Sequence, residues 1–102
     1  MNKTYVKPTT LSDILVSDAL KCYGVVDNKS EDLAVGSPLV LINDVWEKAT
    51  TTNITNASKC GILCEYATSK ATYTIMLIGA VKFVKVDETI KKEFFKSNLI
   101  YQ

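Results

Sequence analysis

The stretch from residue 57 to residue 101 constrains the fold most, because its pattern changes from alternating to helical and back. Residues 61–67 alternate in the way a half-buried strand does. After a short polar break, residues 71–86 are rich in β-branched and aromatic side chains, which helices disfavour. This order predicts a β-hairpin. Gly79 interrupts the second strand, where a glycine marks a bulge, a bend or a close backbone approach, and we expect a kink there.

A short helix is predicted after the hairpin. Asp87 is a good N-cap, Glu88 lies in the first turn, where the helix dipole favours an acid, and Asn98 is a suitable left-handed stop. The apolar positions of this segment are Ile90, Phe94 and Phe95. Because so short a helix is marginal alone, we expect it to dock on the sheet before residues 99–101 return as a closing strand.

The first half of the chain has a less regular pattern. Residues 1–10 are polar and contain Pro8, which predicts an N-terminal arm without a core of its own. Residues 11–23 could form an amphipathic helix, but their apolar positions do not keep a helical period, so extended structure is favoured. Further on, glycine and proline predict a bend at residues 35–39, and the composition of residues 49–58 predicts a loop.

Length and composition indicate one small domain, residues 11–102, that follows the arm. The chain has 102 residues, of which 47% are hydrophobic, enough for a single core. We predict a mainly β fold, a small barrel-like domain with one short C-terminal α-helix. The net charge of +1 does not suit a nucleic-acid partner. The longest apolar run, residues 75–81, is far shorter than the roughly 20 residues of a membrane helix, so no membrane contact is expected.

Side chains for catalysis are scarce. The sequence contains no histidine, which removes the usual general base and the commonest metal ligand. Cys60 and Cys64 invite a redox or metal interpretation, but four strand residues span about 13 Å, whereas a disulfide needs α-carbons about 5.5 Å apart. We therefore expect these two residues and Cys22 to be buried apolar side chains. No catalytic residue, metal ligand or cofactor is expected, and the chain is not expected to be an enzyme.

Several aromatic and apolar residues are candidates for contacts. Trp46 and Tyr23 could stack on a ligand, although a lone tryptophan beside a turn is more often a core or interface anchor. Phe83 and Val84 are adjacent apolar residues, where the strand either switches faces or is partly covered on both. The segment 73–78 is apolar on both faces, which is more than a lone domain of this size can readily cover. This surplus predicts a subunit interface at Tyr73, Ile75 and Leu77.

Taken together, these motifs resemble the bacteriophage head decoration proteins of the lambda type. Residues 33–41, LAVGSPLVL, look like the family's glycine followed by an apolar strand, and residues 60–67, CGILCEYA, look like its strand after a variable loop. Residues 72–86 resemble the next strand, and residues 87–101 resemble the C-terminal helix with its closing strand. The resemblance covers about residues 12–102.

The resemblance implies a β-tulip fold and a homotrimer on three-fold sites of the expanded phage head, which it stabilises against the pressure of packaged DNA. The partners would be copies of the chain itself and the major capsid protein. The location would be the outer surface of the virion, after synthesis in the bacterial cytoplasm. In the arm, Thr4, Tyr5, Val6 and Lys7 would add a strand to the capsid lattice by edge pairing. The alternative is a small β-barrel ligand-binding or adaptor module, or the base domain of a head fibre.

Overall fold

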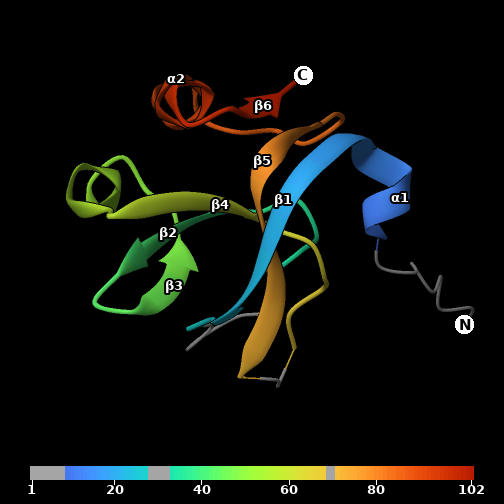
Figure 1. The fold of residues 1–102 in the computed structure, drawn as a ribbon. Helices are drawn as coiled ribbons and strands as arrows, with labels where there is room; N and C mark the ends of the chain where they lie inside the picture. The colour runs from blue at the N-terminus through green and yellow to red at the C-terminus, as the bar shows by residue number, and fades with distance from the viewer. Residues whose placement is uncertain (1–8, 28–32, 69–70) are drawn as a thin grey trace, which may run out of the picture.

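The computed structural model describes residues 9–27, 33–68 and 71–102 (Figure 1). The arm residues Thr4, Tyr5, Val6 and Lys7 lie outside the described residues. The elements are α1 (Leu11–Ile14), β1 (Leu15–Val25), β2 (Pro38–Ile42), β3 (Val45–Lys48), the 3-10 turn η1 (Asn53–Asn56), β4 (Lys59–Leu63), β5 (Thr72–Val81), α2 (Glu88–Lys96) and β6 (Leu99–Tyr101). The fold is therefore mainly β with a C-terminal α-helix, as predicted, and α1 is a single turn before β1.

The six strands form one sheet in the order β1–β5–β4–β2–β3, and β6 pairs in parallel with the end of β5. β5 is central, since β1 lies antiparallel along one of its edges while β4 and then β6 occupy the other. The sheet curls until Val26 forms a bridge with Trp46 of β3. The Asp27 N–H donates to the Trp46 carbonyl at 2.8 Å. This contact joins the two ends of the strand order and makes the sheet barrel-like.

β4 and β5 form the predicted hairpin with different limits. The register of β1 against β5 shifts next to Gly79, but the extra residue, Ala19, lies in β1 and not in β5. At Gly79 the backbones approach closely instead, since a side chain there would lie 2.6 Å from the Ser17 carbonyl. The predicted strand 71–86 is wrong in its last five residues, because β5 ends at Val81. The Lys82 N–H still donates to the Ile14 carbonyl at 2.8 Å, next to the last strand pair of Leu15 with Val81, and the chain beyond it is no longer strand.

One chain covers both faces of the sheet. The helix-side core contains Ile62, Met76, Val81, Ile90, Phe94, Leu99 and Tyr101, among others. The inner core, enclosed by the curl, contains Val26, Leu33, Leu39, Trp46, Leu63, Ala67, Tyr73 and Ile75. Tyr73 and Ile75 are 1% and 0% exposed, so these two residues are not available for the predicted subunit interface, and Leu77 is half-buried beside them. The curl of the sheet therefore covers the apolar side chains of residues 73–78 for which an oligomer was predicted.

The C-terminal helix and strand follow the prediction closely. The Asp87 carboxylate accepts a hydrogen bond of 2.8 Å from the Thr89 N–H, and Asn98 ends the segment with a φ of 64°. Ile90 and Phe94 are buried against the sheet. Phe95 is 66% exposed, so its assignment to the apolar side of the helix is wrong. Figure 1 shows α2 and β6 lying across one end of the sheet.

Candidate assembly surface

The edge strand β1 carries four exposed apolar side chains, Val16, Leu20, Tyr23 and Val25, which together are called the apolar stripe; they follow the strand rather than one face of it, since alternation along β1 places Leu20 and Tyr23 on opposite faces. Among the described residues, eight large apolar side chains are exposed, and four of them form this stripe. β1 pairs with β5 on one edge, and no described strand pairs with its other edge between Leu15 and Val25. An exposed edge of this kind can accept another strand or pack on another protein.

The same edge also has features that limit uncontrolled pairing. Lys21 and Asp18 form an ion pair of 2.8 Å, and the hydrogen bond to this carboxylate raises the pKa of Lys21. The register against β5 shifts at three places along β1. Charges and bulges on an edge strand disfavour nonspecific association. The stripe therefore suits a partner that matches an irregular strand.

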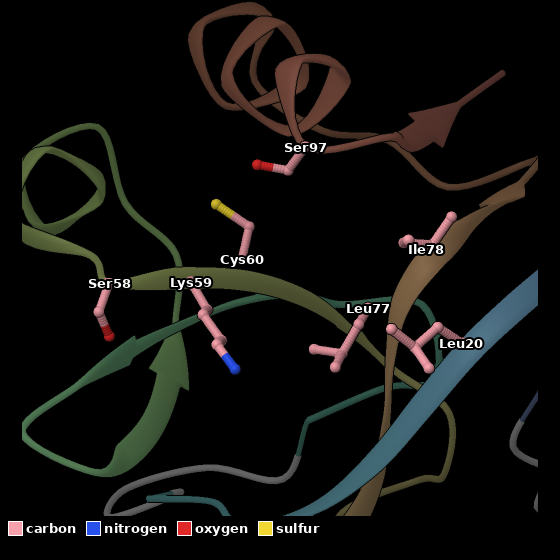
Figure 2. Close-up of a pocket in the computed structure, with 7 residues that line it drawn as sticks. All are labelled: Leu20, Ser58, Lys59, Cys60, Leu77, Ile78 and Ser97. Carbon is pink, nitrogen blue, oxygen red and sulfur yellow. The ribbon is translucent and has the colours of Figure 1, made fainter.

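An open hollow lies where β4 and β6 diverge along the same edge of β5. Its volume is about 290 Å³, and it is lined by Leu20, Ser58, Lys59, Cys60, Leu77, Ile78 and Ser97 (Figure 2). Leu20, Leu77 and Ile78 gather on one side, while on the other side the Cys60 thiol points toward the Ser97 hydroxyl. The hollow therefore combines an apolar wall with a polar rim. Leu77, the third residue of the predicted interface, contributes to that wall.

A second hollow of about 390 Å³ lies against β1 and β5 and is lined by Lys21, Cys22, Tyr23 and Thr74. Tyr23 is 80% exposed, in contrast to Trp46, which is buried in the inner core. The prediction of a core anchor is therefore confirmed for Trp46. Tyr23 instead belongs to the apolar stripe, where its ring can contact a partner.

The three cysteines are free, and only Cys64 is fully buried, whereas Cys22 and Cys60 are half-buried. The prediction of a buried apolar thiol is thus confirmed for Cys64 alone. Burial raises the pKa of all three thiols, that of Cys64 to about 11. Each thiol is therefore mainly protonated at neutral pH, and a protonated thiol is a poor nucleophile.

The loop after β5 displays an aromatic ring. Phe83 is 80% exposed and has a φ of 66°, a left-handed conformation that costs about 1–2 kcal/mol for a residue with a side chain. Its neighbours hold it there, since the Lys82 N–H is bonded to Ile14 and Val84 turns inward onto the helix-side core. The Lys82 ammonium lies 5.1 Å from the centroid of the ring. In the sequence, the signal for this change of face was the pair of adjacent apolar residues 83 and 84.

The described residues lack two further kinds of site. No group of three or more histidine, cysteine, aspartate or glutamate side chains in this part of the chain could hold a metal ion. No helix in the same ranges is long and apolar enough to cross a membrane.

Comparisons with protein-family models, curated proteins and solved structures give no match for this chain. The resemblance to head decoration proteins therefore rests on the sequence motifs alone.

Proposed function

We propose that this protein decorates an expanded bacteriophage head, binding as a trimer at three-fold sites and stabilising the shell against internal DNA pressure. The observation that carries the proposal is the apolar stripe on the edge strand β1, which only the turn α1 separates from the arm in the chain. Exposed apolar patches and open strand edges are typical of proteins that pack on a larger assembly. Such a surface serves binding rather than turnover of a substrate.

The order of elements supports the same function. The resemblance implies a β-rich domain that ends in a capped helix and a closing strand, and α2 and β6 have these properties. The Tyr101 hydroxyl donates a hydrogen bond of 2.6 Å to the Gly36 carbonyl, which fixes the closing strand to the bend before β2. In the proposed function this folded body contacts neighbouring capsid subunits.

The stabilising mechanism is thermodynamic linkage. A protein that binds the expanded shell but not its dissociated subunits shifts the equilibrium toward the shell by its binding free energy. Many copies bind one head, so a modest affinity at each site adds up over the lattice. The major capsid protein is one partner in this proposal, and copies of this chain are the other.

The test is cosedimentation with heads assembled from the capsid protein of the same genome. Purified chain should bind expanded heads saturably and raise the temperature at which they open. Unexpanded shells of the same protein are the matched control and should bind little. Equal binding to both shells, or no binding to expanded heads, would contradict the proposed function.

A further inference from the structure

The open edge of β1 has free backbone groups at defined positions. Tyr23 lies opposite Thr74, whose carbonyl accepts a hydrogen bond from the Cys64 N–H, so the backbone groups of Thr74 face β4. In an antiparallel ladder, two opposite residues either face each other or both face away. The N–H and C=O groups of Tyr23, and those of Lys21 two positions before it, therefore face the open edge of β1.

Asp18 presents its backbone groups at the same edge. It lies opposite Gly79, whose N–H donates to the Asn98 carbonyl at 3.1 Å, on the side of β5 away from β1. Between Asp18 and Lys21 the strand contains Ala19, the extra residue of the bulge. Because of this extra residue, Asp18 and Lys21 point the same way, and their side chains form the ion pair of 2.8 Å.

We propose that β1 of one copy pairs antiparallel with β1 of a second copy, about a two-fold axis that passes beside Ala19 and Leu20. Asp18 of each copy then lies opposite Lys21 of the other, so unlike charges meet at both places. Ser17 lies opposite Cys22. Val16 lies opposite Tyr23, and pairs of β-branched and aromatic side chains across two strands stabilise a sheet.

Charge and shape both identify a second copy as the occupant of this edge. The two-fold registers that centre on Asp18 or on Lys21 instead place like charges opposite each other, which destabilises a sheet. In the proposed register the bulge of one strand lies opposite the same bulge of the other. Both strands then carry the extra residue Ala19, so the ladder stays in step on either side, whereas a regular strand would lose its register there.

The contact is small and reversible. Pairing from Val16 to Tyr23 spans about 24 Å of each strand. Main-chain hydrogen bonds supply the affinity when one strand adds to the edge of another. A contact of this length belongs to the class of weak interfaces, below about 1,200 Å² in total, so we expect a dissociation constant above about 1 μM. Copies that are held close together on one surface reach a high effective concentration, at which a weak contact forms.

This pairing goes beyond the proposed function. A two-fold contact joins copies in pairs and cannot form a trimer, so on a phage head it would connect chains of neighbouring trimers. Strand pairing uses the backbone edge, and side chains of a strand project above and below the sheet. The exposed side chains of the apolar stripe therefore stay open to the capsid protein on both faces.

The first experiment reverses the charges, which lie on exposed side chains. Asp18→Lys and Lys21→Asp each place like charges opposite each other, and each should raise the concentration at which half of the chains are paired by at least about tenfold. When the two variants are mixed, unlike charges meet again at both places, so the mixture should pair about as well as the parent. Sedimentation equilibrium measures all three samples. Glu93→Lys, which breaks a similar exposed ion pair on α2, is the matched control and should leave pairing unchanged.

A cross-link tests the register. Ser17 and Cys22 face β5 with their backbone groups, and opposite residues of this kind have α-carbons about 4.5 Å apart, within the range of a disulfide. Oxidation of Ser17→Cys by dissolved oxygen with a copper catalyst should join the new thiol to the native Cys22 of the second copy, with loss of two protons and two electrons. The covalent pair should appear on a non-reducing gel and disappear when Cys22→Ala is added. Ala19→Cys, which lies opposite Leu20, is the control and should not be joined to Cys22.

Three results would overturn the pairing: charge variants that associate like the parent, a mixture of them that pairs no better than either alone, or equal cross-linking from Ser17→Cys and Ala19→Cys. A parent chain that stays monomeric at every concentration would also overturn it. Head binding by such a monomer would leave the proposed function intact. Conversely, pairing through β1 without head binding would remove the proposed function and keep the pairing.

Discussion

At the scale of single residues, Tyr101 connects parts of the chain that are far apart in sequence. Its hydroxyl donates to the Gly36 carbonyl, and its ring lies 5.9 Å from that of Phe94. Burial raises the pKa of Tyr101 well above its ordinary value of 10, because the phenolate would lose its hydration. The folded protein therefore retains the neutral phenol to a higher pH than the unfolded chain does.

Tyr101→Phe should destabilise the fold by about 1–3 kcal/mol at neutral pH, because the buried Gly36 carbonyl loses its donor. Above about pH 10 the unfolded tyrosine ionises while the folded one keeps its proton, so the parent protein loses stability as pH rises through this range. The variant lacks that titration. Urea unfolding between about pH 8 and pH 11 should show that the difference in unfolding free energy between the parent and the variant becomes smaller as pH rises. If this difference stayed constant or grew with pH, the raised pKa of Tyr101 would be contradicted.

At the scale of elements, the local sequence predicts what local forces determine. Asp87 and Asn98 set the ends of α2 through a cap and a left-handed stop, and the hairpin follows from alternation. The end of β5 could not be predicted, because it falls where the pairing with β1 ends at Leu15 and the pairing with β6 ends at Tyr101, and both partners lie far away in the sequence. The hollow escaped prediction for a similar reason, since it exists where the pairings of β4 and β6 with β5 diverge.

Asp87→Ala should lower the stability of the protein by about 1 kcal/mol, since the Thr89 N–H loses its acceptor at the start of α2. This corresponds to a fall of about 4–8 °C in melting temperature for a domain of this size. Asp87→Asn keeps an acceptor oxygen and should lose less than half as much. Calorimetry measures both variants. Equal losses for alanine and asparagine would show that the charge, and not the hydrogen bond, provides the stabilisation.

At the scale of the whole molecule, the curl of the sheet determines which surface is left for partners. Because the bridge between Val26 and Trp46 closes the inner core, Tyr73 and Ile75 are enclosed by the chain itself. Composition alone indicated surplus apolar surface but could not place it, since closure depends on contacts distant in sequence. In the structure, exposed apolar surface lies instead on the apolar stripe of β1 and at Phe83. A trimer stays a prediction, and of its three predicted contact residues only Leu77 is left partly exposed.

The arm belongs to the same scale, because its proposed role appears only on the assembled head. Fixing ten residues costs on the order of 10 kcal/mol in backbone entropy, so we predict that the arm attaches only where strand pairing and burial of Tyr5 and Val6 on the head outweigh that cost. Deletions of the arm must spare Thr10. Its N–H donates to the Asp13 carboxylate at 2.9 Å and caps α1, which leads into β1.

Deleting residues 2–8 should therefore leave the fold and the melting temperature unchanged while weakening attachment to expanded heads by about a hundredfold or more, equivalent to about 2.7 kcal/mol. A full-length variant with Tyr5→Ser and Val6→Ser keeps the backbone for pairing and should lose less. Cosedimentation at a series of chain concentrations measures all three proteins. If the truncated chain bound as tightly as the full chain, the arm would be a passive tail. Docking on the head would then fall to the folded body, where the apolar stripe on β1 is the surface that remains.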